Sequence, residues 1–242
     1  MAATAANVVH PDDVTASRES GDTAETKVTF DRSRGCELLE QRVVRYGPGR
    51  SRSRSVGDRQ EVLYVVAGRG ELELDGETHD LEPDTGVYVA PEETYAVVNP
   101  GPEPLDVVSV VAPADRQEAS GERRVTVRFS DQPEHPASSE RTFKYLINQD
   151  AGCFDVTQFV GIVQPSKAPF HSHTYDEVGY IVEGEGFAHV DGKSIPLRAG
   201  SCFHLAPGQE HCIENSGTTP MRILGVFHPS GDPASREYGD NK

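Results

Sequence analysis

The sequence predicts an all-β protein built from two copies of one unit. Its 242 residues include 23 Gly and 17 Pro, which interrupt the chain every few residues and leave little room for long helices. Short runs rich in Val, Ile, Tyr and Phe alternate with turn residues, a pattern typical of β sandwiches and small barrels. The third observation is an internal repeat, in which many residues recur at a fixed separation of 116 positions.

The repeat holds without a gap over some fifty residues. Further upstream, Gly35-Cys36 matches Gly152-Cys153 at a separation of 117, so the two copies differ there by one residue. The recurring pairs are Glu61/Glu177, Tyr64/Tyr180, Gly68/Gly184, Gly70/Gly186, Asp75-Gly76/Asp191-Gly192, Leu81/Leu197, Ala90-Pro91/Ala206-Pro207, Asn99/Asn215, Gly101/Gly217 and Val110/Val226. In both copies the Asp-Gly pair separates two strand-like runs, which predicts a two-residue hairpin turn.

The elements follow in order along the chain. Residues 1–25 are rich in Ala, Thr, Asp and Ser and are expected to be disordered. The first β unit is expected over residues 26–112, a polar linker over 113–141, the second β unit over 142–229, and a disordered tail over 230–242.

Composition excludes several classes of partner. The formal net charge of −16 repels polyphosphates, so we expect no nucleic-acid ligand. No stretch approaches 18 apolar residues, and residues 1–20 lack a basic start followed by an apolar run, so we expect no membrane segment, no secretory signal and a cytoplasmic location. The four cysteines form no C-x-x-C pair and are expected to be reduced thiols.

A histidine-rich segment of the second unit carries the candidate chemistry. His171 and His173 are two residues apart, so on a strand both side chains point to one side. Glu177 would lie roughly 13 Å further along a straight strand, so a bend over residues 174–176 is needed to bring it back. With His211 from another strand, the set offers three imidazoles and one carboxylate, which suit a divalent transition metal. His-x-His alone also occurs often in exposed loops without a metal.

These residues resemble the two motifs of the cupin family. Pro169-Phe-His171-x-His173-x3-Glu177-x6-Gly184 is similar to the first motif, and Gly200-x7-Gly208-x2-His211-x3-Asn215 is similar to the second. Through the repeat, the whole chain resembles bicupins. The resemblance implies two tandem double-stranded β-helix (jelly-roll) barrels and a metal held by His171, His173, Glu177 and His211. It also implies that the protein can form a homodimer through sheet edges.

The first unit departs from this pattern at the ligand positions. At a separation of 116, Ser55, Gly57 and Tyr95 replace the three histidines, and at 117 the upstream pair becomes Arg54 and Val56. We therefore expect a first barrel without metal that serves as a scaffold. An alternative is that Arg50, Arg52 and Arg54 receive a carboxylate or phosphate at its mouth.

The function expected is that of a metal-dependent enzyme acting on a small organic molecule. The bicupin resemblance implies dioxygenase-type, isomerase or hydrolase chemistry at an Fe, Mn, Ni or Zn ion. The alternative is a non-catalytic module, a sensor or storage protein that binds a metal or small ligand. His189 and His204 are candidate catalytic groups, whichever of them faces inward. The neighbour of a ligand, Cys212, is expected to point away from the ion and pack in the core.

Overall fold

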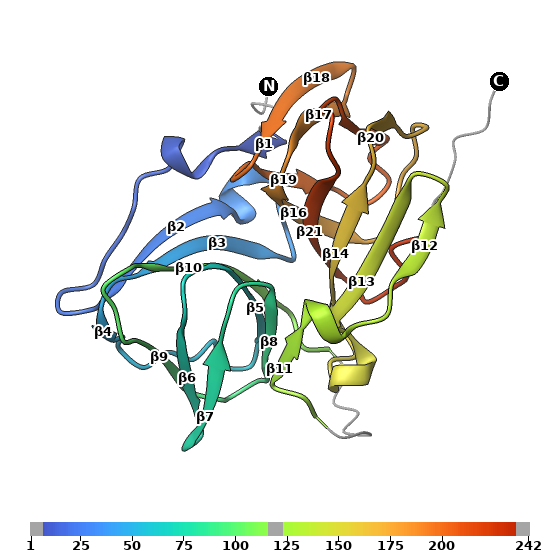
Figure 1. Ribbon diagram of the computed structural model, residues 1–242. Coiled ribbons are helices and arrows are strands. Elements are labelled where there is room, and N and C mark those ends of the chain that lie inside the picture. The colour runs from blue at the N-terminus through green and yellow to red at the C-terminus, as the bar shows by residue number, and fades with distance from the viewer. Residues whose placement is uncertain (1–6, 116–122, 236–242) are drawn as a thin grey trace.

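Two antiparallel β barrels form the protein, as seen in a computed structural model that describes residues 7–115 and 123–235 (Figure 1). Each barrel consists of a large sheet facing a four-stranded sheet. The N-terminal pair has the strand orders β11-β8-β5-β10-β3-β2 and β4-β9-β6-β7. The C-terminal pair has the orders β1-β19-β16-β21-β14-β13-β12 and β15-β20-β17-β18. The prediction of two tandem jelly-roll barrels is confirmed.

The strands of the N-terminal barrel are β2 (Ala24–Phe30), β3 (Glu40–Tyr46), β4 (Gly49–Arg50), β5 (Gln60–Ala67), β6 (Gly70–Leu74), β7 (Glu77–Leu81), β8 (Thr85–Val89), β9 (Tyr95–Asn99), β10 (Leu105–Ala112) and β11 (Thr126–Arg128). The strands of the C-terminal barrel are β1 (Val8–Val9), β12 (His135–Ser138), β13 (Arg141–Ile147), β14 (Thr157–Val163), β15 (Ser166–Lys167), β16 (Asp176–Glu183), β17 (Glu185–Val190), β18 (Lys193–Arg198), β19 (Cys202–Leu205), β20 (His211–Asn215) and β21 (Met221–His228).

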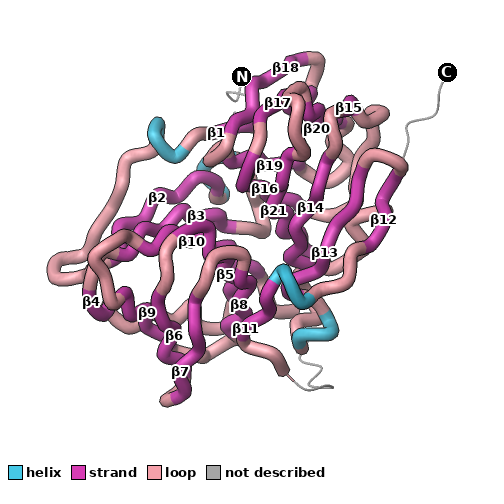
Figure 2. Tube along the Cα trace, viewed as in Figure 1, coloured by secondary structure: helices cyan, strands magenta, loops and turns pink. Residues whose placement is uncertain are grey.

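The helices of the described residues are single 3₁₀ turns, which Figure 2 shows as short cyan segments among the strands. They are η1 (Pro11–Asp13), η2 (Arg32–Arg34), η3 (Phe129–Asp131) and η4 (Gln149–Ala151). None of these helices has the length or apolar content needed to cross a lipid bilayer.

The strands preserve the repeat of the sequence. Strands β5, β9 and β10 of the first barrel recur as β16, β20 and β21 of the second with every boundary shifted by 116 residues. Both predicted hairpin turns are present, because φ is positive at Asp75 and Gly76 and again at Asp191 and Gly192. Local turn chemistry and strand register therefore agree in the two copies.

Segments expected to lie outside the barrels are in fact part of them. The expectation of disorder over residues 1–25 is wrong for residues 7–25, because Val8 and Val9 pair with Phe203 and Cys202 at the edge of the C-terminal barrel. Residues 1–6 lie outside the described residues. Such pairing with a strand nearly 200 residues away leaves no local signal in the sequence.

The linker predicted over residues 113–141 is likewise partly structured. Strand β11 pairs with β8 of the N-terminal barrel, and β12 pairs with β13 of the C-terminal barrel. Residues 116–122 lie outside the described part. In the predicted tail over 230–242, Gly231 accepts a hydrogen bond from the Thr157 hydroxyl at 3.0 Å, and residues 236–242 are not described.

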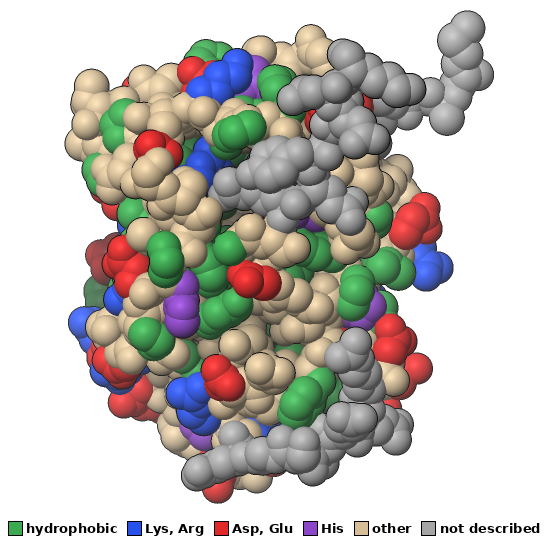
Figure 3. Space-filling model, turned by 90° about the vertical axis from the view of Figure 1, so that its right-hand side faces the viewer, with side chains coloured by type: hydrophobic (Ala, Val, Ile, Leu, Met, Phe, Trp, Pro, Cys, Tyr) green, Lys and Arg blue, Asp and Glu red, His purple; other side chains and the backbone are tan. Residues whose placement is uncertain are grey.

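The two barrels pack against each other through the outer faces of their large sheets. One hydrophobic cluster joins Val62 and Tyr64 on β5 to Val178 on β16 and Val226 on β21. Each barrel also has its own interior cluster. On the outside, the face that carries β12 and β13 shows hydrophobic, acidic and basic side chains interspersed (Figure 3).

The four cysteines, Cys36, Cys153, Cys202 and Cys212, are buried and unpaired, as predicted. Burial raises the pKa of the Cys202 thiol to about 12. The Cys212 thiol lies 3.0 Å from the carbonyl oxygen of Ala168 and is buried in the C-terminal barrel, where it contributes to packing.

Candidate metal centre

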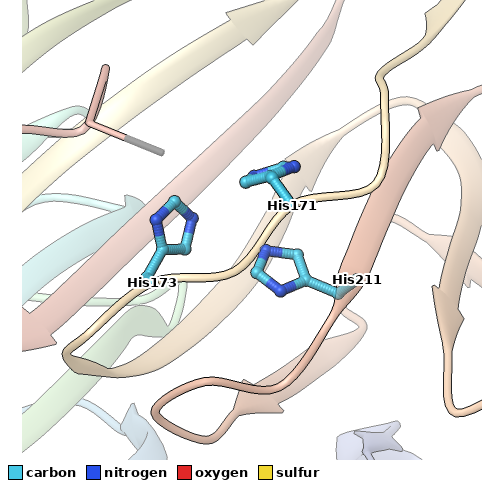
Figure 4. A group of neighbouring side chains, drawn as sticks. All are labelled: His171, His173 and His211. Atoms are coloured by element: carbon cyan, nitrogen blue, oxygen red, sulfur yellow. The ribbon is translucent and has the colours of Figure 1, made fainter. Parts of the chain in front are cut away.

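Three histidine side chains come together inside the C-terminal barrel (Figure 4). His171 and His173 lie in the extended segment before β16, and His211 begins β20. The backbones of His171 and His211 form an antiparallel bridge with hydrogen bonds of 3.0 and 2.9 Å, which places their side chains beside each other. The ring centroids are 4.5 Å apart for His171 and His211, 4.9 Å for His171 and His173, and 5.1 Å for His173 and His211.

Hydrogen bonds to Nδ1 orient each of the three rings. Nδ1 of His171 lies 3.0 Å from the carbonyl oxygen of Pro169, and Nδ1 of His211 lies 2.8 Å from that of Gln209. A carbonyl can only accept, so Nδ1 carries the proton in both rings and the lone pair of the neutral imidazole is on Nε2. Nδ1 of His173 is 2.9 Å from the Tyr175 hydroxyl. Such partners hold metal-binding histidines in position in other proteins.

Glu177 lies at the edge of this cluster on β16. The chain bends after His173, so the Glu177 carboxylate returns to 3.8 Å from Nε2 of His173. The close group of donor atoms comprises the three histidines, and Glu177 adds the negative charge beside them. Burial raises the pKa of Glu177 to about 8, because the carboxylate is removed from water inside the barrel.

This donor set fits a divalent transition metal. The three imidazole donor atoms lie within 4.8 Å of one another. Ligands about 2.1 Å from a common ion lie roughly 3–4 Å apart, so the cluster needs only a small contraction to bind one. Imidazole nitrogens with one carboxylate oxygen suit Mn, Fe, Ni or Zn, and the ion would offset the cost of burying the Glu177 carboxylate.

The cluster opens into a cavity of about 90 Å³. Apart from the three histidines and Glu177, its wall is mainly hydrophobic. The lining side chains include Ala137, Phe143, Phe159, Val163, Phe203, Leu205, Ile213, Ile223 and Pro233. The described charged groups on the wall are Glu177 and Arg141, whose guanidinium donates a hydrogen bond to the carbonyl of Ile213.

Neither candidate catalytic histidine, His189 or His204, lines this cavity. His189 pairs across the sheet with Cys212, whose neighbour His211 faces inward, so His189 lies on the opposite face of that sheet. There its ring bonds Ser194 at 2.8 Å and Glu214 at 2.6 Å.

His204 faces the other barrel. Its Nε2 lies 2.6 Å from Asp176, and the second oxygen of Asp176 accepts a hydrogen bond from the backbone N–H of Leu38 at 3.3 Å. Cys36 approaches the same carboxylate at 3.7 Å. These donor atoms also form a close group, in which the His204 contact lies within the C-terminal barrel and the Cys36 contact crosses between the two barrels.

Three residues near the cavity were not predicted. Tyr175 orients His173, and its position two residues later on an extended segment was the available signal. Arg141 and Pro233 come from segments expected to be linker and tail. Their approach to the cavity depends on long-range packing, so local sequence carried no signal for them.

The first barrel has different chemistry at the matching place. Arg54 forms the antiparallel bridge with Tyr95 that His171 forms with His211, so the structure selects the separation of 117 for this segment. The Tyr95 hydroxyl donates to Glu61 at 3.1 Å, and Ser109 also bonds that carboxylate. No imidazole stands at these positions in the first barrel, as the sequence predicted.

The arginines at its mouth are already paired with acids. Arg50 bonds Glu73 at 2.7 Å, Arg52 lies 3.2 Å from Glu19, and Arg54 bonds Asp22 at 2.6 Å. Intramolecular carboxylates thus satisfy these guanidiniums, and the alternative of an anion site formed by the three arginines has no support in the structure.

The model of the Cupin domain matches residues 42–111 and 159–227, one segment in each barrel. The chain belongs to the cupin family. Because the match occurs twice, it is a bicupin.

Two curated proteins resemble parts of this cupin. The oxalate-binding protein of Thermotoga maritima is 39% identical over 63 residues, which are 26% of this chain and 52% of that protein. The tetracenomycin polyketide synthase protein TcmJ of Streptomyces glaucescens is 32% identical over 60 residues, 24% of this chain and 40% of that protein. The chain therefore spans about half or less of the length of these relatives.

Solved structures match the fold over nearly the whole chain. Protein YlbA of E. coli has a TM-score of 0.79 at 15% identity, and the match covers 93% of this chain and 91% of the YlbA chain. A single-residue variant of the oxalate decarboxylase of Bacillus subtilis has a TM-score of 0.74 at 13% identity, with 94% and 78% covered. At these identities the likeness establishes the shared two-barrel fold alone.

Proposed function

We propose that this bicupin is a metal-dependent enzyme whose single metal centre lies in the C-terminal barrel. His171, His173, Glu177 and His211 hold one Fe, Mn, Ni or Zn ion. The observation that carries the proposal is the orientation of the rings: carbonyl acceptors fix the proton of His171 and His211 on Nδ1, leaving Nε2 as the donor beside His173 and a buried carboxylate. When bound, the ion supplies Lewis-acid polarisation of an oxygen donor.

The reaction takes place on a small organic molecule in the cavity, with dioxygenase-type, isomerase or hydrolase chemistry. The protein's part is to hold that molecule against the cluster and to exclude water with its hydrophobic wall.

The second candidate function is a non-catalytic module that binds a metal and a small ligand. One observation favours it: the candidate acid–base groups His189 and His204 lie outside the cavity, so the described wall offers little proton-transfer chemistry beyond the proposed ligands. The oxalate-binding name of the Thermotoga relative points the same way.

Elemental analysis of purified protein tests the metal centre. We expect about one transition-metal ion per chain, and His173→Ala to remove most of it while circular dichroism shows an intact β fold. His79→Ala is the matched control, because His79 lies on β7 of the first barrel. Equal metal content in the wild type and His173→Ala would contradict the assignment.

Turnover separates the two candidate functions. The metal-loaded protein is screened for O₂ consumption and product formation with phenolic, keto-acid and sugar-like compounds. Turnover that is lost in His171→Ala supports the enzyme. One bound ion with saturable ligand binding and no turnover supports the binding module.

A further inference from the structure

The first residue of β16, Asp176, connects the second barrel to the first beside the histidine cluster. Side chains alternate along the strand, so that Glu177 lines the cavity whereas Asp176 and Val178 face the other barrel. Both oxygens of the buried Asp176 carboxylate accept hydrogen bonds. One lies 2.6 Å from Nε2 of His204 in the same barrel, and the other receives the backbone N–H of Leu38, from the first barrel, at 3.3 Å.

The two chain neighbours of Asp176 both belong to the candidate metal centre. The Tyr175 hydroxyl lies 2.9 Å from Nδ1 of His173, and the Glu177 carboxylate lies 3.8 Å from Nε2 of the same ring. Asp176 itself directly follows the bend that returns the chain toward the cluster. Because planar peptide units join these three residues, fixing the Asp176 side chain limits how far the hydroxyl and the Glu177 carboxylate can move.

A short turn of the first barrel presents Leu38 to this carboxylate. The turn, η2, begins after Asp31, whose side chain accepts a backbone N–H of the turn at 3.0 Å, and ends at Gly35, where φ is 85°. Cys36 follows, with its backbone N–H bonded to the carbonyl of Asp31 at 3.0 Å and its thiol 3.7 Å from Asp176. Capping at both ends therefore fixes the turn that holds Asp176.

The repeat contains the same contact with neutral groups. Turn η4 of the second barrel places the thiol of Cys153 3.2 Å from the amide oxygen of Gln60. Gln60 begins β5 as Asp176 begins β16, at the separation of 116 residues, and Tyr88 stands where the second barrel has His204. The carboxylate and the imidazole thus occur in the barrel that has the histidine cluster, and hydrogen bonds to a charged group are about twice as strong as those between neutral groups.

We propose that Asp176 is a positioning residue of the metal centre, through which turn η2 of the first barrel keeps Tyr175 and Glu177 in the arrangement that holds a divalent ion. This inference rests on the proposed function, because it requires an ion at the histidine cluster. The first barrel then contributes to metal affinity, although the four proposed ligands lie in the second barrel. The equivalent contact at Gln60 contributes to the packing of the barrels alone.

Metal affinity of an Asp176 variant tests this role. An amide has one acceptor oxygen in place of two, so Asp176→Asn can accept from either His204 or Leu38 but not from both. We expect its affinity for Mn²⁺, measured by competition with a chelator, to fall about tenfold. The absorption bands of bound Co²⁺ should shift as well, because they depend on the geometry of the ligands. Gln60→Ala is the matched control: it removes the whole of the equivalent contact and should leave both readouts unchanged.

A pair of cap substitutions tests the contribution of the first barrel. Asp31→Ala loosens η2, and Asn148→Ala loosens η4, where the Asn148 side chain accepts the backbone N–H of Asp150 at 3.0 Å. We expect Asp31→Ala, in the barrel without the histidine cluster, to lower Mn²⁺ affinity about threefold. Asn148→Ala, in the barrel that has the cluster, should leave Mn²⁺ affinity unchanged.

The outcomes separate this inference from the proposed function. If Asp176→Asn and Gln60→Ala lose metal affinity equally, or if neither loses any, the inference is wrong and the metal centre stands. If the wild type binds neither Mn²⁺ nor Co²⁺, the proposed function itself fails. Circular dichroism of the metal-free proteins shows which variants are folded. Should Asp176→Asn fail to fold, equal Mn²⁺ affinities of Asp31→Ala and Asn148→Ala would overturn the inference.

Discussion

Tyr175 holds the ring of His173 through Nδ1, the atom that backbone carbonyls hold in the two other histidines. Its ring also stacks on that of Phe227, with centroids 3.9 Å apart, so the hydroxyl has a fixed position. Tyr175→Phe keeps this stacking and removes the hydroxyl. We expect metal affinity to fall about tenfold, as for loss of other groups that orient ligands.

Competition with a chelator measures that change. Tyr180→Phe is the matched control, because Tyr180 lies on β16 and packs in the cluster between the barrels. Equal affinities of Tyr175→Phe and the wild type would show that the hydroxyl does not position His173.

Asp22 gives the first barrel a pH-dependent contribution to stability. Burial raises the pKa of this carboxyl, but hydrogen bonds from the backbone N–H groups of Arg52 and Ala24 and the charge of Arg54 outweigh burial and lower the pKa below its ordinary value of 3.8. The folded protein therefore binds this proton less readily than the unfolded chain. The stabilisation is present above pH 3.8 and is lost as pH falls through the lowered pKa.

Asp22→Asn should accordingly lower the free energy of unfolding by about 1–3 kcal/mol at pH 7. At pH 3, below the ordinary value of 3.8, the unfolded chain takes up this proton, so the difference from the wild type should shrink. Urea unfolding at the two pH values measures both. A difference that is the same at pH 7 and pH 3 would contradict the role of the carboxylate charge.

At the scale of elements, Gly179 on β16 and Gly225 on β21 are partners in the large sheet, and a substitution at Gly179 tests how tightly the sheet is packed. Gly179→Ala would place a methyl group in the Phe203 ring, and overpacking of this kind costs about 1–3 kcal/mol. Gly161→Ala on β14 is the control, because its methyl group would meet its nearest neighbours at an ordinary 3.7 Å. Thermal unfolding should separate the two variants, and equal stability would show that the ring moves aside freely.

Most elements could be predicted from local signals. The Asp-Gly turns and the recurring residues set strand order and register in both copies, and the spacing of His171, His173, Glu177 and His211 located the cluster. The side of the sheet on which the His189 and His204 side chains lie could not be predicted. It depends on the register of each strand after a turn whose geometry the sequence does not define. Strand β1 was missed because its partner is distant in sequence.

At the scale of the whole molecule, the two barrels share one hydrophobic cluster and direct hydrogen bonds. Gln41 donates to the carbonyl of Gly179 at 3.0 Å, and Gln158 donates to that of Leu63 at 3.2 Å. Separation of the barrels would expose both amides and the apolar faces. We therefore expect a single cooperative unfolding transition by scanning calorimetry of the metal-free protein, and two resolved transitions would contradict this coupling.

The N-terminal segment connects the barrels a second time, because β1 belongs to the C-terminal barrel and the chain then continues into β2 of the N-terminal barrel. Asn7 donates to the carbonyl of His204 at 3.1 Å, and β1 pairs with the strand that carries Phe203. Deletion of residues 1–10 should destabilise the protein by about 2 kcal/mol, which corresponds to a decrease in melting temperature of roughly 4–8 °C for a chain of this size. An unchanged melting temperature would show that the segment contributes nothing to stability.

Arg54 stands in the first barrel where His171 stands in the second. A guanidinium is part of the polypeptide, so it cannot be chelated, exchanged for a competing element or lost when supply runs short. The positive charge at this position of the first barrel is therefore independent of metal supply, and the proposed ion would act on the second barrel alone.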